Sequence, residues 1–65
     1  MKVEIGQAAG NIWKILKVEG ETTITRLKKK SGLPVNYFYM GLGWLAREEK
    51  LNFRRDQRNL FIALK

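Results

Sequence analysis

The sequence contains no cysteine, no histidine and a single proline, and these absences exclude several classes of function. Without cysteine the chain forms no disulfide and offers no thiolate to a metal ion. Without histidine it lacks the usual zinc ligand and the commonest general base, so the Ser-His-Asp and Cys-His arrangements of hydrolases are absent. We therefore expect a protein that is not an enzyme, with no cofactor, no metal site and no small-molecule substrate.

Long apolar runs are absent as well. No stretch approaches the roughly 18 residues that a membrane span requires, and the first residues do not follow the pattern of a signal peptide. The sequence thus predicts a cytoplasmic protein without membrane contact. Its 65 residues, of which 45% are apolar, suit one small domain over residues 1–65 and are too apolar for a disordered tail.

Positive charge is concentrated in one part of the chain. Residues 1–24 carry three lysines and three glutamates, whereas residues 25–65 carry ten basic and three acidic side chains. The whole net charge of +7 therefore lies in the second part. Such an asymmetry indicates a polyanionic partner that meets a defined face of the molecule. The alternative is that the basic residues only keep a small domain in solution.

The first third of the chain predicts a helix followed by a short strand. Apolar residues recur at spacings of three and four over residues 3–18, as on one stripe of an amphipathic helix. Gly20 follows, where the end of a helix often requires a left-handed residue. Residues 21–24 form a short segment in which the last three residues are β-branched, which favours a brief strand.

Two further helices are predicted in the middle of the chain. Thr25 is the expected N-cap of a short helix over residues 26–31, which Gly32 ends. Pro34 suits the first turn of the next helix, which we expect to run to Glu48 or Glu49. The core side of that helix should consist of Phe38, Gly41, Leu42, Leu45 and Glu49.

The C-terminal part predicts a hairpin. Leu51 and Phe53 alternate with polar residues in its first strand, and Leu60, Ile62 and Leu64 do so in its second. Residues 54–59 should form a basic loop between them. The order of the elements is that of a winged helix-turn-helix, an α+β fold with three helices and a small antiparallel sheet made of the short strand and the hairpin.

The most distinctive stretch is Leu42-Gly43-Trp44-Leu45-Ala46-Arg47-Glu48-Glu49-Lys50-Leu51. Together with the segments TRLKKK at 25–30 and SGL at 31–33, it resembles a family of small winged helix-turn-helix proteins of bacteria and archaea that are uncharacterised. The resemblance covers essentially the whole chain. It implies the winged-helix fold and suggests a homodimer, but it supplies no activity.

The candidates for nucleic-acid binding lie on the second helix, on the third helix and in the hairpin. The second helix should cross the DNA backbone, and arginines at a hairpin tip can reach an adjacent groove. An asparagine near the start of the third helix could pair with adenine, and a tyrosine could contact a phosphate or a base. The candidates are Lys28, Lys29, Lys30, Asn36, Tyr39, Arg47, Arg54, Arg55 and Arg58.

The third helix has no Lys or Arg before Arg47, so its outward side lacks the usual base-reading residues. The sequence therefore predicts phosphate contacts with duplex DNA and low sequence specificity, with RNA as another polyanion. Asn36 and Tyr39 could equally make local contacts.

The alternative function is a module for protein interaction or dimerisation that does not bind DNA. Aromatic residues and Met favour the centres of interfaces, and glycines inside a helix suggest a close approach by another backbone. The candidate dimer surface consists of Tyr37, Met40, Gly41, Gly43 and Trp44, with residues 1–5 as a second candidate. Internal packing of Trp44 is the competing interpretation.

Overall fold

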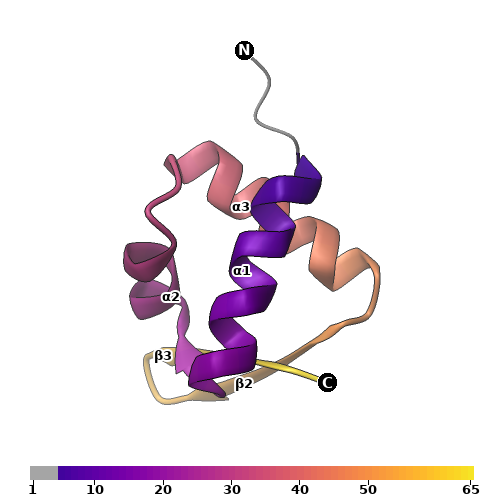
Figure 1. Cartoon of the computed structure of the whole chain (residues 1–65). Helices are drawn as coiled ribbons and strands as arrows, with labels where there is room; N and C mark the ends of the chain where they lie inside the picture. The colour runs from indigo at the N-terminus through magenta and orange to yellow at the C-terminus, as the bar shows by residue number, and fades with distance from the viewer. Residues whose placement is uncertain (1–4) are drawn as a thin grey trace.

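The computed structural model describes residues 5–65 and contains three helices and a three-stranded antiparallel sheet (Figure 1). The elements, in chain order, are α1 (Ile5–Glu19), β1 (Thr22–Thr23), α2 (Ile24–Ser31), α3 (Val35–Arg47), β2 (Leu51–Asp56) and β3 (Asn59–Leu64). The predicted winged-helix order is confirmed, and the sheet order is β1-β3-β2. The first two residues of the predicted 3–18 helix, and nearly all of the 1–5 segment, lie outside the described residues.

The core lies between the three helices and one face of the sheet. It consists of Ala9, Ile12, Leu16, Leu27, Phe38, Leu42, Leu45, Leu51 and Ile62. A Cβ atom on Gly41 would lie 2.9 Å from the Cβ and the carbonyl carbon of Ala8, so α1 and α3 approach each other too closely for a larger residue. Figure 1 shows α1 lying across the front of α3. None of the described helices is long and apolar enough to cross a membrane.

Thr23 belongs to two elements at once. Its backbone pairs with Phe61 of β3, and its Oγ1 accepts a hydrogen bond from the backbone N–H of Arg26 at 3.2 Å, which caps α2. The prediction of Thr25 as the cap is therefore wrong, and the strand is shorter than residues 21–24. Thr23 has extended backbone angles that suit both a strand and an N-cap, so one residue ends β1 and starts α2.

Each helix is followed by a residue with a positive φ angle, which is a glycine after α1 and α2 and a glutamate after α3. Gly20 and Gly32 adopt positive φ angles of 77° and 65°, as the sequence predicts. α3 ends at Arg47 rather than at Glu48 or Glu49. Glu49 takes a φ of 56° and the Lys50 N–H donates to the Leu45 carbonyl at 3.0 Å, so Glu49 is exposed and does not extend the core side of α3.

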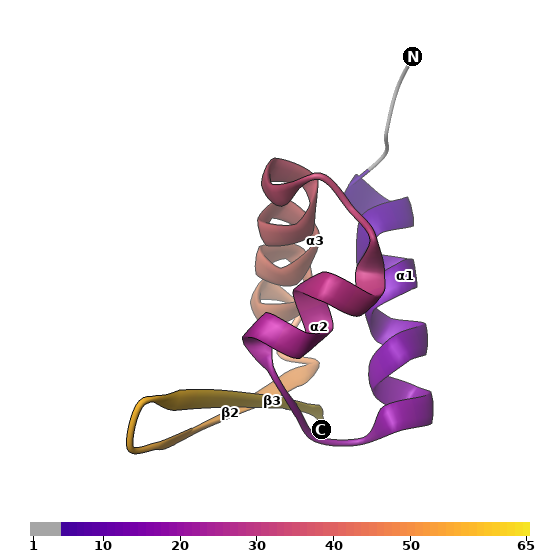
Figure 2. The same cartoon turned by 90° about the vertical axis from the view of Figure 1, so that its left-hand side faces the viewer.

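The hairpin β2–β3 projects beyond the helices on the side of α3, away from α1 (Figure 2). Its register pairs Leu51 with Leu64, Phe53 with Ile62 and Asp56 with Asn59. Only residues 57 and 58 lie between the strands, so the expected basic loop over 54–59 is wrong: Arg54 and Arg55 are strand residues. We call this hairpin the wing.

Candidate nucleic-acid interface

Alternation along the strands gives the wing two different faces. Leu51 is buried in the core, so Phe53 and Arg55 lie on the same, helix-facing face at the next two alternate positions. Arg54 lies on the opposite, outer face, where it stands across from Phe61. Neighbouring arginines of β2 therefore point to different surroundings.

On the outer face, the side chain of Arg54 contacts those of Glu21 and Phe61. Arg54 donates to the two carboxylate oxygens of Glu21 through its Nη2 and Nε atoms, at 2.8 and 3.1 Å. Its guanidinium also lies 4.4 Å from the centre of the Phe61 ring. The hydrogen bonds from Arg54 lower the pKa of Glu21 below its ordinary value and raise the pKa of Arg54. The charge of Arg54 is therefore already neutralised within the molecule.

The helix-facing face of the wing is open beyond the core. Leu51 and Ile62 are buried, but Phe53 is 49% exposed, because β2 is an edge strand of the sheet whereas its partner β3 lies between β1 and β2. Arg55 follows on the same face and is exposed, and Arg58 lies in the turn at the tip. Within residues 5–65, neither arginine forms a salt bridge. Sequence alternation placed Phe53 on the same face of the strand as Leu51 and did not identify it as a surface group.

The three consecutive lysines of α2 have three different environments. Lys30 donates to Glu19 of α1 at 2.8 Å, and Arg26 lies 3.8 Å from the same carboxylate, so the pKa of Glu19 is lowered, mainly by its hydrogen bond to Lys30. The Nζ of Lys28 lies 5.7 Å from the centre of the Tyr39 ring of α3. Lys29 is exposed and forms no salt bridge with another described residue.

The outward row of α3 is only lightly charged. Asn36, Met40, Gly43 and Arg47 recur at spacings of three and four and are exposed, opposite the buried row that contains Phe38 and Leu42. Tyr39 is 46% exposed beside this row, and its ring meets the buried Phe38 ring edge-on at 5.1 Å. Lys28 thus brings from α2 a positive charge that the first half of α3 lacks.

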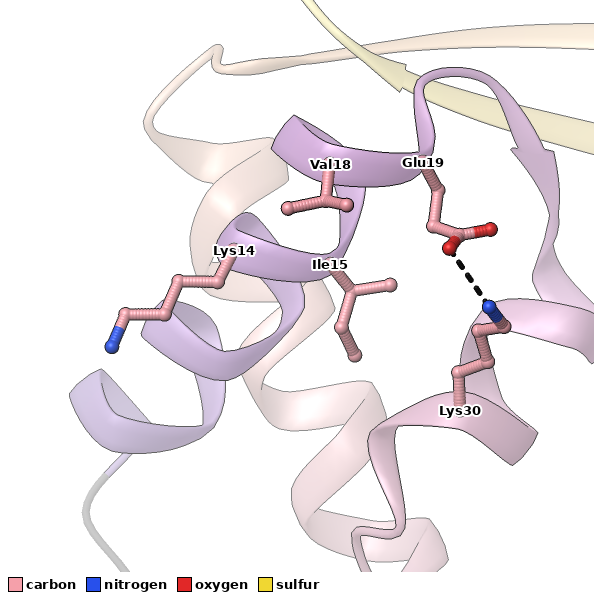
Figure 3. A pocket seen from close by; sticks show the side chains of 5 residues that line it. All are labelled: Lys14, Ile15, Val18, Glu19 and Lys30. Atoms are coloured by element: carbon pink, nitrogen blue, oxygen red, sulfur yellow. Dashed lines mark hydrogen bonds and ion pairs between the residues drawn. The ribbon is translucent and has the colours of Figure 1, made fainter.

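A shallow hollow lies where the end of α1 meets α2. Figure 3 shows Ile15 and Val18 along its apolar side and the ion pair of Glu19 with Lys30 across it, while Lys14 points away from that pair. Because Lys30 pairs with Glu19, it adds no free cation to the candidate interface. The described residues contain no group of three acidic, His or Cys side chains that could hold a metal ion.

A groove between α1 and α3 contains the two tryptophans. It is lined by Gly6, Ala9, Gly10, Trp13, Trp44, Leu45 and Lys50. Trp44 is 45% exposed and Trp13 is partly buried, with the Lys17 Nζ 4.7 Å from the centre of a Trp13 ring. Gly43 is exposed on α3, whereas Gly41 is buried against α1 of the same chain. Gly41 is therefore not available to a partner, which corrects its place in the candidate dimer surface.

The structure thus divides the predicted nucleic-acid residues into two groups. Lys30 and Arg54 are held by Glu19 and Glu21. The others belong to α2, to α3, or to the wing, which Figure 2 shows meeting α3 in an L. They are Lys28, Lys29, Asn36, Tyr39, Arg47, Arg55 and Arg58. Phe53 is an addition to this group.

Comparison with known proteins identifies the family of the chain. The family model described as "Winged helix-turn-helix domain (DUF2582)" matches residues 1–64. The chain belongs to this family. The uncharacterized protein MJ1608 of Methanocaldococcus jannaschii is 37% identical to it over 65 residues, which is 95% of this chain and 91% of that protein.

A solved structure is also similar to this chain in both fold and sequence. The solution NMR structure of protein BT2368 from Bacteroides thetaiotaomicron superposes with a TM-score of 0.78 at 33% identity. The match covers 92% of this chain and 73% of that one. The fold is therefore shared with a solved structure of similar sequence, and a winged helix-turn-helix domain suggests nucleic-acid binding.

Proposed function

We propose that this DUF2582 protein is a cytoplasmic, non-catalytic protein that binds duplex DNA through phosphates with low sequence specificity. The observation that carries this proposal is the distribution of ion pairs. Among the described residues, Glu19, Glu21 and Asp56 pair only with Arg26, Lys30 and Arg54. The cations on or beside the L-shaped side have no such carboxylate and so remain available to phosphates.

Five cations form this available set, which consists of Lys28, Lys29, Arg47, Arg55 and Arg58. Each phosphate that a cation contacts releases a counterion, so the affinity depends steeply on salt. If about four to six phosphates are contacted, log K falls against log salt with a slope near −4 to −5. Base readout is limited because Asn36 is the one amide on the outward row of α3.

The test is a titration of labelled random duplex DNA of about 20 base pairs at about 50 and 200 mM salt, followed by fluorescence anisotropy. We expect weak binding at low salt that becomes weaker as salt rises. Arg55→Gln with Arg58→Gln should reduce affinity by similar factors for all sequences and should reduce the salt slope by about 2.

The matched control is Lys14→Gln with Lys65→Gln. It removes the same charge from α1 and from the end of β3, at exposed positions away from the wing tip. If the control lowers affinity as much as the wing variant, net charge alone drives binding and the proposed face is wrong. Absence of binding at low salt would contradict the DNA proposal as a whole.

A second candidate function is homodimerisation through the groove between α1 and α3. The observation that favours it is the half-exposed Trp44 beside Trp13. Charges of both signs lie near the groove: Lys50 lines it, Lys17 lies over the Trp13 ring, and Glu48 follows Trp44 by one helical turn without a salt bridge to another described residue. A two-fold contact can pair such charges reciprocally.

Light scattering at high micromolar concentration distinguishes a 7.6 kDa monomer from a dimer. If the groove is the interface, Trp44→Ala gives a folded monomer, whereas Val18→Ala, at an apolar position that is 83% exposed elsewhere on α1, leaves a dimer. Thermal unfolding of a dimer also shifts to higher temperature as protein concentration rises. A monomeric wild type would exclude this second function.

A further inference from the structure

The wing contains two phenylalanines whose surroundings differ. Phe61, on the outer face, is partly buried under the guanidinium of Arg54 at 4.4 Å. Phe53, on the helix-facing face, is 49% exposed, although the two residues before and across from it, Leu51 and Ile62, are buried. Phe53 therefore presents an aromatic ring to solvent at the inner end of the L-shaped side.

Arginines precede and follow Phe53 in the chain. Arg55 follows Phe53 on the same face of β2, and Arg47 ends the outward row of α3, from which the chain turns into β2. Farther along α3, Tyr39 is 46% exposed and has the Lys28 Nζ 5.7 Å from its ring centre. Exposed aromatic rings between basic side chains match the chemistry of nucleobases joined by phosphates, because every base has a face that can stack.

An intact duplex does not offer that chemistry to Phe53. Its bases are stacked inside the helix, and only their edges and the phosphates are accessible in the grooves. The outward row of α3 carries few groups that read such edges, since Met40 and Gly43 occupy its centre. An unpaired base beside a duplex presents a free face and a phosphate together, which the exposed ring and the neighbouring arginines can both engage.

We infer that the protein prefers duplex DNA with an unpaired tail and that Phe53 stacks on a base of that tail. This inference rests on the proposed duplex binding and names the form of DNA that the same site takes. Arg55 and Arg58 hold phosphates of the duplex or the tail. Tyr39 of α3 offers a second exposed ring on which a base can stack. Stacking of one base contributes a factor of roughly 5 to 150 in affinity.

The test compares three labelled probes that share one duplex of about 20 base pairs: blunt, with an unpaired tail of about six nucleotides, and with a tail of the same length made of abasic sites. Wild-type protein should bind the tailed duplex at least about 5-fold more tightly than the blunt one. The abasic tail, which keeps the phosphates, should give much less of this gain. Equal affinity for the tailed and abasic probes would overturn the inference.

Variants of Phe53 complete the test. Phe53→Ala should reduce the affinity for the tailed probe to that for the blunt probe, whereas Phe53→Tyr should retain the preference for the tailed probe. A circular dichroism melt checks that both variants are folded. If Phe53→Ala weakens binding to all three probes equally, Phe53 serves the wing and not an unpaired base, and the inference is wrong.

The outcomes also separate this inference from the proposed function. Binding to the blunt probe with no gain from the tail supports duplex binding and overturns the role of Phe53. Binding to the tailed probe alone supports stacking and overturns the duplex proposal. Absence of binding to any probe at low salt overturns both.

Discussion

The two faces of the wing carry the same residue types and use them differently. Each face has one arginine of β2 and one phenylalanine: Arg54 with Phe61 outside, Arg55 with Phe53 on the helix-facing side. On the outer face Glu21 holds the guanidinium at 2.8 Å, and the guanidinium covers the ring. On the other face no carboxylate of the described residues pairs with Arg55. The carboxylates of Glu21 and, at 3.9 Å, Asp56 therefore make Arg54 structural, whereas Arg55 stays available to a ligand.

The largest expected difference concerns stability within the helix-facing row. Ile62 is fully buried and Phe53 is half exposed, although they are direct partners across the strands. Ile62→Ala should lower the free energy of unfolding by about 2–5 kcal/mol, and Ile62→Val by about 0.5–1.5 kcal/mol. Phe53→Ala should cost less than about 1 kcal/mol, because an exposed ring leaves no cavity. Urea unfolding followed by circular dichroism measures all three. An equal cost for Phe53→Ala and Ile62→Ala would show that the wing packs against the helices.

The second comparison replaces each of the two neighbouring arginines, Arg54 and Arg55, in a separate variant. Arg55→Gln should reduce the slope of log K against log salt for duplex DNA by about 1, because it removes one phosphate contact. Arg54→Gln should leave that slope unchanged, because Glu21 already neutralises Arg54, and should instead lower the melting temperature. Anisotropy titrations and thermal melts of the two variants provide the measurement. A loss of slope in Arg54→Gln would mean that DNA displaces Glu21.

The smallest expected effect is on pH dependence. Hydrogen bonding to Arg54 lowers the pKa of Glu21 in the folded state from its ordinary value of 4.5. A lowered pKa gives a stabilising contribution that is present above 4.5 and is lost as the pH falls through the folded-state pKa. Glu21→Gln should therefore make the loss of stability in acid shallower. Melting temperatures at pH 7 and in the acid range measure it, with Glu48→Gln, which breaks no salt bridge of the described residues, as the control.

The fold was predictable because its determinants are local. The apolar stripe of α1, the left-handed Gly20 and Gly32, and Pro34 before α3 mark the helices from spacing and backbone chemistry alone. The errors arise where neighbouring residues offer the same chemistry. Thr23 and Thr25 are both good N-caps, and the choice between them depends on the pairing of Thr23 with Phe61, which lies far away in the sequence.

The candidate site was less predictable because its properties depend on contacts between distant segments. Polar residues 54–59 resemble a loop, but a wing that extends past the helices has polar strands as well. Nothing local indicates that Glu21 meets Arg54 or that Lys30 meets Glu19. The exposure of Phe53 depends on the sheet order, which leaves β2 at the edge, and on the register that pairs Phe53 with the buried Ile62 of the central strand.

Thr23 gives the molecule a mechanical connection between the wing and α2. The residue that pairs with Phe61 at the base of the wing also caps α2, which carries Lys28 and Lys29. A ligand that pulls the wing must either carry the start of α2 with it or break the cap. Hydrogen exchange at the Arg26 amide, the donor in that cap, would therefore report on force applied at the wing tip.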